Sequence, residues 1–292
     1  MTNATLARRS LAFYARSHLG TIFGSAIATA VLVGALLVGD SVRGSLRQMA
    51  LSRLGKIEYA LASGDRLFRA ALGAEVQAEA SVGMAAVLQI PGTASNPTGS
   101  ARAHGVQVNG VDQDFWAFAA APPSGTINPG ETWINARLAS QLKTKIGETI
   151  LIRVPRTSHL SRDAPLSPDE DSTVALRVQV SRVLNDEAFG RFGLAASQVP
   201  PMNAFVPLAF LQQKVNATNQ ANLLLAKTSS SNSLEHSFAK RFTLADAQLL
   251  FRPVPNRSEL ELRSPRVFLD AQIAAAALKM TNAQPVLTYF VN

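Results

Sequence analysis

One uncharged stretch near the N-terminus constrains this chain more than any other feature. Between Leu19 and Gly39 the sequence contains no Asp, Glu, Lys or Arg. At about 1.5 Å per residue, a helix over this stretch is roughly 30 Å long, which matches the hydrocarbon thickness of a bilayer. The stretch therefore predicts a transmembrane helix over residues 19–39.

A cleaved export signal is the alternative interpretation of the same stretch. Arg8-Arg9 resembles the start of a twin-arginine signal, but Arg16 and His18 separate the pair from the apolar residues. Cleavable signals usually have a shorter apolar core, of about 7–15 residues. Small residues near Gly34-Ala35 and near Gly39-Asp40-Ser41 still offer a cleavage site. The length favours a retained anchor, and the signal peptide stays open.

Small residues recur every four positions within the predicted membrane helix. Such spacing lets a second helix approach closely, so that van der Waals contact holds the two together. Gly and Ala are also simply common in membrane helices, and the two interpretations carry similar weight. The candidate helix-packing residues form two series, Gly20, Gly24, Ala28 and Ala26, Ala30, Gly34.

The segments on either side of the predicted span are basic. After it, Val42, Leu46 and Met49 recur at helical spacing with arginines between them, which predicts that the helix continues as a stalk over residues 40–55. Before it, residues 1–18 are predicted to form an amphipathic segment on the cytoplasmic membrane surface. The arginines of the two flanks nearly balance, so charge alone does not set the orientation.

The composition fits one membrane element attached to a globular domain. Hydrophobic residues make up 47% of the 292 residues and charged residues 16%. The net charge is +8, which is compatible with an anionic membrane surface or nucleic acid. However, the basic residues are spread along the chain and aromatic residues are only 7%, so we expect membrane lipid and no nucleic acid as a partner. The absence of cysteine excludes disulfides and thiolate metal sites.

The remainder of the chain, residues 56–292, reads as a mixture of helices and strands. A strand over 56–61, a helix over 66–80 and a strand over 82–90 ended by Pro91-Gly92 predict a β-α-β unit. Asn135 is a predicted cap for a helix over Ala136–Leu142. Strands and helices do not alternate strictly, so we predict the α+β class. Further strands are expected at 101–111, 133–134, 149–154, 174–184, 205–207, 223–225, 249–251 and 286–291, a break at Thr157–Thr173, and helices at 208–215, 234–242 and 268–280.

Several motifs in this part resemble one family. Gly105–Asp112 is followed by Phe115-Trp116, then by Glu131–Leu142 and Lys145–Ile150, and Asn203–Leu208 comes later. This order resembles the extracytoplasmic domain of MacB/FtsX-type ABC transporter permeases. In that family a Gly-Val-Asp strand leads to an aromatic helix, and an Asn…Leu-Ala…Leu helix is then followed by Gly-Asp-Thr and a strand. Here Glu148 stands in the place of that Asp, which is a mild departure.

The resemblance implies an architecture and a set of partners. The external domain would have two lobes, with a strand-rich lobe inserted at about residues 125–228. The chain would be a permease subunit in the cell inner membrane, paired with an ABC ATPase subunit and forming a dimer or heterodimer of permeases. Family members have four membrane helices, three of them after the external domain. We therefore expect this sequence to be a fragment of such a permease.

The sequence offers no recognisable catalytic or cofactor-binding motif. Gly55-Lys56 is followed by Ile57, so no phosphate-binding loop forms and ATP would be bound by the partner. The histidines show no metal-binding spacing. Asp169-Glu170-Asp171 lacks the ligand spacing and Gly of a calcium loop and is expected to be a solvated acidic loop. We expect no enzyme activity, no cofactor and no metal. The four histidines are His18, His104, His159 and His236.

Two functions remain in competition at this level. The first is a permease subunit whose external domain moves with a partner ATPase, in export, lipoprotein release or transmembrane signalling. The second is a membrane-tethered binding or sensor module without a transport role. Coding sequence for further hydrophobic spans after Asn292, or a neighbouring ATPase gene, would favour the first. A stop codon there would favour the second.

Overall fold

The computed structural model describes residues 3–157, 173–195, 197, 199–228, 231–266, 269–280 and 282–286. It divides into a helical unit that extends through Ser52 and includes Leu194–Gln198, and a domain formed by Arg53–Gly193 together with the residues from Val199 onward. The two units are described separately.

The helical unit consists of two consecutive helices. Helix α1 spans Asn3–Phe13, a turn occurs at Tyr14, and α2 spans Ala15–Ser52 without interruption. At about 1.5 Å per residue, the 38 residues of α2 extend roughly 57 Å. Neither helix buries a residue. Within the described residues, α2 is the one helix long and apolar enough to cross a membrane, with a mean hydropathy of 2.2 in its most apolar window.

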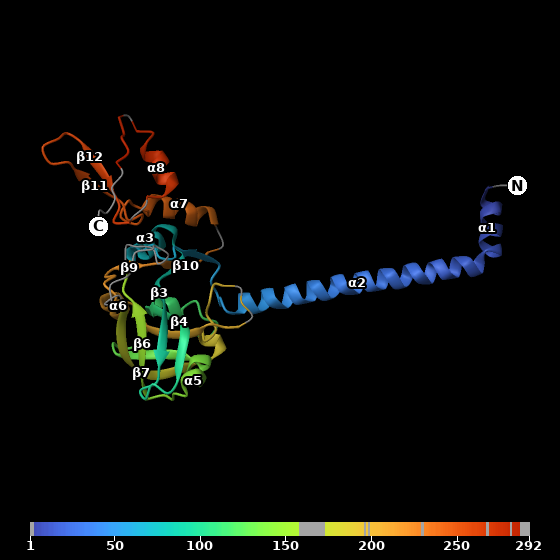
Figure 1. The fold of residues 1–292 in the computed structure, drawn as a ribbon, viewed down its shortest axis with the longest axis horizontal. Coiled ribbons are helices and arrows are strands. Elements are labelled where there is room, and N and C mark those ends of the chain that lie inside the picture. The colour runs from blue at the N-terminus through green and yellow to red at the C-terminus, as the bar shows by residue number, and fades with distance from the viewer. Residues whose placement is uncertain are drawn as a thin grey trace, which may run out of the picture. The chain divides into compact units, whose positions relative to one another are not determined.

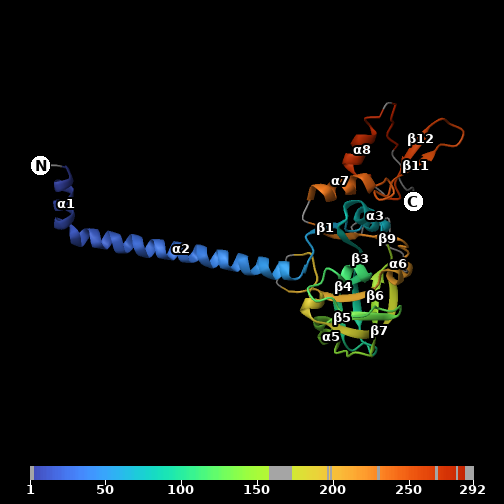
Figure 2. The same cartoon turned by 180° about the vertical axis from the view of Figure 1, so that it is seen from behind.

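The domain is built around a six-stranded, barrel-like sheet (Figures 1 and 2). β4 pairs with β8 and β5 with β7 in parallel, and the other neighbours are antiparallel. Pairing of Thr93 in β3 with Arg153 in β6 closes the barrel. In order around it, the strands are β3 (Gly83–Ser95), β4 (Arg102–Val111), β8 (Met202–Pro207), β5 (Glu131–Asn135), β7 (Thr173–Leu184) and β6 (Thr149–Pro155).

The predicted strand end at Pro91-Gly92 is wrong, because β3 runs through both residues to Ser95. Pairing of β3 with β10 (Leu223–Lys227) ends at Val87, and pairing with β6 starts at Thr93. Between these positions β4 is the only strand beside β3, so Pro91 lies where no second ladder requires its missing N–H. A Cβ at Gly92 would lie 2.6 Å from the Arg153 carbonyl oxygen, so the close approach of the two strands requires glycine.

A second core lies beside the barrel and shares β3 with it. Strands β1 (Tyr59–Ala62) and β3 both pair antiparallel with β10, which lies between them, so the predicted β-α-β connection is split by a third strand. Helix α3 (Ala71–Ala80) packs on this sheet and contacts α7 (Ser231–Arg241). The buried side chains of this core are Phe68, Leu72, Val76, Met84, Ala86, Ala221, Leu224 and Ala226.

The remaining elements mix helices with short strands, so the domain is of the mixed α/β kind. The helix predicted over 66–80 begins only at Ala71, because Phe68-Arg69 forms strand β2, paired with β9 (Gln220–Ala221). The helix predicted over 268–280 is shorter in the structure, where α8 spans Ala271–Ala277. Most of the predicted break at Thr157–Thr173 and of the predicted strand at 286–291 lies outside the described residues. The other elements are α4 (Gln113–Trp116), α5 (Ala136–Leu142), a 3-10 turn at Asp186–Ala188, α6 (Leu208–Lys214), β11 (Leu250–Pro253) and β12 (Leu260–Arg263).

The barrel draws its strands from a longer part of the chain than the predicted strand-rich lobe. β3 and β4 precede residue 125, whereas the lobe is predicted at about 125–228. The division of residues 56–292 into two lobes therefore stays a prediction. Among the described residues, two of the buried clusters each include part of β3.

Candidate functional site

The candidate helix-packing residues all lie on α2. A Cβ added at Gly20, Gly24 or Gly34 would meet nothing within 4 Å. Ala26 and Ala28 are two residues apart and so point about 200° apart around the helix axis. The centres of the two series, Gly24 and Ala30, lie about 120° apart, whereas Gly20 and Gly34 lie only about 40° apart. The series Gly20, Gly24, Ala28 and the series Ala26, Ala30, Gly34 therefore mark neighbouring faces of α2. A helix-packing role for either series stays a prediction.

The candidate stalk residues lie on the last third of the same helix. Val42, Leu46 and Met49 share one face of α2 at spacings of four and three residues. The helix ends at Ser52, three residues before the predicted end of the stalk at Gly55. Residues 53–56 form a non-helical turn, so the stalk helix does not continue through them.

The first residues of the domain, Arg53–Lys56, form a tight junction. Gly55 has φ +56°, in the left-handed region that favours glycine. The Lys56 N–H donates a 2.8 Å hydrogen bond to the Phe118 carbonyl oxygen. A Cβ at Gly55 would lie 2.4 Å from that same oxygen, and 3.0 Å from the Phe189 ring. Both backbone conformation and space therefore require glycine at this position.

The junction rests on a cluster of buried aromatic rings. The ring of Phe115 lies 4.9 Å from that of Phe189 and 5.8 Å from that of Phe205, measured between centroids. Trp116 and Trp133 are stacked at a tilt, 5.0 Å apart, and each is only 3% exposed. Both tryptophans are thus core residues. A cluster packed this closely has little freedom to yield when the junction beside it moves.

A polar cluster fixes the chain on the other side of these rings. Asn135 caps α5 as predicted, since its side-chain oxygen accepts a 3.0 Å hydrogen bond from Leu138 N–H. Its amide nitrogen also donates to the carbonyl oxygens of Gly190, at 2.7 Å, and Pro201, at 2.8 Å. The sequence signalled the cap but not these longer-range bonds, because both partners lie more than fifty residues away.

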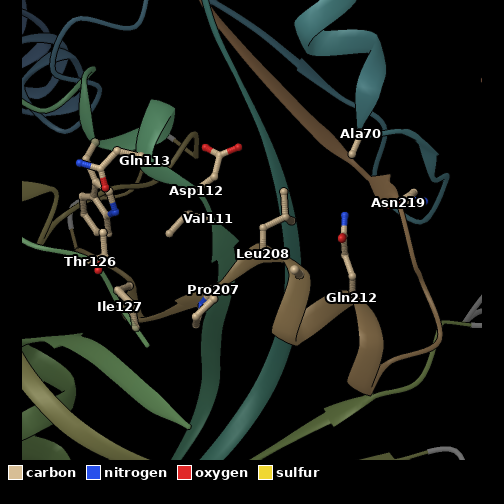
Figure 3. A pocket seen from close by; sticks show the side chains of 12 residues that line it. Ala70, Val111, Asp112, Gln113, Thr126, Ile127, Pro207, Leu208, Gln212 and Asn219 are labelled. Atoms are coloured by element: carbon tan, nitrogen blue, oxygen red, sulfur yellow. The ribbon is translucent and has the colours of Figure 1, made fainter. Parts of the chain in front are cut away.

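A surface hollow of about 460 Å³ opens where the parallel strands β4 and β8 end (Figure 3). Ligands of α/β proteins tend to bind at the carboxyl ends of parallel strands. In Figure 3 the Asp112 and Gln113 side chains lie on one side of the hollow and those of Gln212 and Asn219 on the other, with Pro207 and Leu208 between them. Most of the wall is apolar, and its apolar residues include Val111, Trp116, Ile127, Pro207, Leu208 and Ala209.

Asp112 is the one charged residue among the described residues that line this hollow. It caps α4, with a carboxylate oxygen that accepts a 3.3 Å hydrogen bond from Phe115 N–H. Partial burial raises the pKa of the Asp112 carboxyl, although the residue as a whole remains exposed and the Phe115 bond opposes the rise. The motif Gly105–Asp112 contains this aspartate, but the sequence gives no sign of the hollow, because its other wall comes from residues 207–219.

No metal centre is found within the described residues, where no group of three or more His, Asp or Glu side chains converges. His159 and the acidic run Asp169-Glu170-Asp171 lie outside the described residues.

A long apolar helix followed by a mixed α/β domain with a six-stranded barrel-like sheet defines the class of this protein as a globular domain carried on an apolar helix. The model of the MacB-like periplasmic core domain matches residues 19–240, well over half of the chain. The chain belongs to this family.

Two of the solved structures that are similar to this chain are extracytoplasmic regions of transporters. The extracellular domain of the noncanonic ABC-type transporter YknZ from Gram-positive bacteria has 13% sequence identity and a TM-score of 0.40, and the match covers 61% of this chain and 88% of that one. The periplasmic region of MacB from Actinobacillus actinomycetemcomitans has 8% identity and a TM-score of 0.42, with coverage of 76% and 92%. A comparison with curated proteins finds no match.

Proposed function

We propose that this chain is part of an ABC transporter permease, with α2 as its membrane anchor and the domain outside the membrane. The observation that carries the proposal is the match of the MacB-like periplasmic core domain to residues 19–240, which includes most of α2. Residues 1–18 would lie on the cytoplasmic side, 19–39 would cross the inner membrane, and the domain would be periplasmic or extracellular. The two core clusters that share β3 would form the two lobes of the external domain.

In this proposal the chain itself does not hydrolyse ATP. The sequence has no phosphate-binding loop, so a partner ATPase subunit would bind the nucleotide. The two small-residue faces of α2 would contact neighbouring membrane helices, either from the rest of the same permease or from a second permease of a dimer or heterodimer. Membrane lipid would cover the parts of the α2 surface that no neighbouring helix contacts.

The junction supplies a physical means of coupling helix and domain. Movement of the stalk would reach the domain through Arg53–Lys56, where the backbone of Lys56 is bonded to Phe118 and no side chain fits at Gly55. Phe118 comes two residues after α4, whose Phe115 and Trp116 belong to the aromatic cluster. A displacement of the junction would therefore be transmitted to this packed cluster and not be absorbed by a loose linker. Such a link suits export, lipoprotein release and transmembrane signalling alike.

The stalk offers the sharpest test of this function. Ser45→Pro removes a backbone donor within α2 and introduces a clash with the preceding turn, at about 3 kcal/mol of local helix stability. The matched Ser45→Ala keeps the helix, since Ala is a better helix former. In the native host, we expect the proline variant to lose coupled transport while its partner ATPase still co-purifies and the external domain still resists limited proteolysis. If the proline variant transports normally, α2 anchors the domain but does not transmit movement to it.

Two further measurements separate the alternatives. N-terminal sequencing of membrane-extracted protein should begin near Met1, whereas a mature start between Leu36 and Val42 would identify the stretch as a cleaved signal.

Chemical crosslinking in native membranes should join this chain to a protein with an ATP-binding loop. If neither an ATPase nor further permease helices are recovered, the tethered binding or sensor module becomes the better description.

A further inference from the structure

The hollow at the ends of β4 and β8 has the size and the mainly apolar walls of a small-molecule site. Its volume of about 460 Å³ falls within the range of small-molecule pockets, about 300–1,000 Å³. Its walls are mainly apolar, and one carboxylate projects from the rim. Predominantly hydrophobic walls with a few placed polar groups are the usual design of such sites.

The walls of the hollow are held in place from both sides. On one side, Asp112 is fixed by the cap that it gives to α4. On the other, Gln212 is 6% exposed and donates a 2.7 Å hydrogen bond to the Gln220 carbonyl oxygen, which ties α6 to β9. Behind α6, Leu211 packs closely on Gly110 of β4, where an added Cβ would lie 3.0 Å from a Leu211 methyl carbon. A site with fixed walls has little ordering cost when a ligand enters it.

The charge of the hollow selects its ligand. Asp112 is its one charged lining residue within the described parts of the chain, and no Lys or Arg from those parts lines it. A cation placed there would gain a charge-assisted hydrogen bond, whereas an anion would face the carboxylate without a compensating basic group. The helices that start at the hollow are too short to offset this, since α4 has 4 residues and α6 has 7.

We propose that this hollow binds a small apolar molecule carrying one ammonium group, with the apolar body against Pro207, Leu208 and Ile127 and the ammonium on Asp112. The site goes beyond the proposed transport role and does not depend on it, because binding can be measured on the isolated full chain. Trp116 lines the hollow and lies beside Trp133, so ligand entry is reported by the fluorescence of the two tryptophans of the sequence.

The experiment compares two probes of one shape, 1-adamantanemethylamine and 1-adamantanemethanol, titrated into the full chain in uncharged detergent. We expect a saturable fluorescence change with both, and a dissociation constant about tenfold lower for the amine, the contribution of a charged hydrogen bond that is still partly solvated. Spermidine, a cation without an apolar body, should produce no change at the same concentrations. Equal binding of amine and alcohol, tight binding of spermidine, or no saturable binding at all would overturn the proposal.

Three variants locate the effect. Asp112→Asn removes the charge but keeps a good helix cap, so the unfolding midpoint should hold while the preference for the amine disappears. Asp114→Asn makes the same charge change two residues on, at an exposed position that does not line the hollow, and should keep the preference. Ala209→Phe places a ring into the hollow from an exposed helix position and should weaken both probes at least about tenfold. If Asp112→Asn and Asp114→Asn behave alike, long-range charge and not the hollow recognises the amine, and the assignment is wrong.

Discussion

The barrel and the C-terminal hairpin use the same kinds of residue with opposite results. In the barrel, alternate positions of each strand point into a common core, and Ile134, Ile152 and Val180 are fully buried. The hairpin β11–β12 also contains large apolar residues, yet every residue of β11 is exposed. The difference lies in what each strand has beside it, since each barrel strand is paired on two sides whereas each hairpin strand has one partner.

The hairpin is nevertheless patterned for burial on one face. Its register places Phe251 opposite Leu262 and Pro253 opposite Leu260, so that one face is entirely apolar. The other face carries Leu250, Arg252, Glu261 and Arg263. Phe251 is 48% exposed and Leu260 is 70% exposed. Two-stranded hairpins are marginally stable on their own. The comparison shows that alternation of apolar and polar residues predicts which face of a strand is apolar, but does not predict whether another element covers that face.

The largest expected effect is that of truncating a ring in the barrel. Phe205→Ala removes a fully buried side chain that packs against Phe115 and Trp116, and should lower the free energy of unfolding by about 3–5 kcal/mol. Urea unfolding of the full chain, followed by the fluorescence of Trp116 and Trp133, measures it directly. A loss below about 1 kcal/mol would mean that the aromatic cluster is not part of the cooperative core.

The next effect concerns the contact that joins the turn before β11 to the second core. Asp246 has a fully buried carboxylate that accepts hydrogen bonds from Arg69 at 2.9 and 3.0 Å and from Thr243 at 2.8 Å. Burial by itself would raise the Asp246 pKa, but these bonds outweigh it and hold the pKa below its ordinary value. Asp246→Asn should cost about 1–3 kcal/mol of local stability and expose residues 242–249 to protease.

The control for that variant is Glu75→Gln, which removes the more exposed partner of the same arginine, at 35% side-chain exposure. We expect it to cost less than about 1 kcal/mol, since exposed ion pairs contribute little. Equal effects of the two variants would show that Arg69 and not the buried carboxylate governs the contact.

A smaller effect is expected at the junction, where Gly55 can be compared with Gly64, a glycine that lies outside the junction, after β1. Gly55 and Gly64 both have left-handed φ, of +56° and +63°, so Ala costs about 1 kcal/mol of backbone strain at either. Only at Gly55 does the new Cβ meet the Phe118 carbonyl. Gly55→Ala should therefore destabilise the barrel by about 1–2 kcal/mol more than Gly64→Ala in urea unfolding. If Gly55→Ala and Gly64→Ala unfold at the same urea concentration, the junction is not tightly packed against the barrel and does not transmit movement of the stalk.

Acid should loosen α7 from α3 without unfolding the barrel. Hydrogen bonds from Lys240 and Arg241 lower the Glu79 pKa from 4.5 to about 2. Because the folded-state value is the lower one, the stabilising contribution is complete above about pH 4.5 and is lost as the pH falls toward 2. Amide exchange in α7, corrected for intrinsic rates, should rise in this window, and Glu79→Gln should flatten that dependence. A dependence that survives in Glu79→Gln would assign the acid effect to Asp246 instead.

The sequence predicted those structural elements that depend only on residues close together in the chain. The uninterrupted helix α2, the cap at Asn135 and the burial of alternate residues in β7 all arise from short-range periodicity. The continuation of β3 through Pro91 cannot be predicted in this way. A proline is tolerated there only because the pairing of β3 with β10 has ended and its pairing with β6 has not yet begun. The hollow escapes prediction for the same reason, since its walls come from segments that only the closed barrel brings together.

The smallest expected effect is also the one that most directly tests the comparison. Phe251→Ala makes the same truncation as Phe205→Ala, but at a side chain that is about half exposed and faces Leu262 alone across the hairpin. A single cross-strand pair contributes about 0.2–1 kcal/mol, and this contribution is local to the hairpin. The unfolding midpoint reported by Trp116 and Trp133, which both belong to the barrel core, should therefore move by less than about 0.5 kcal/mol, while amide protection in β11 and β12 falls. If the midpoint instead shifts toward that of Phe205→Ala, the apolar face of the hairpin is covered in solution, and the hairpin and the barrel unfold as one cooperative unit.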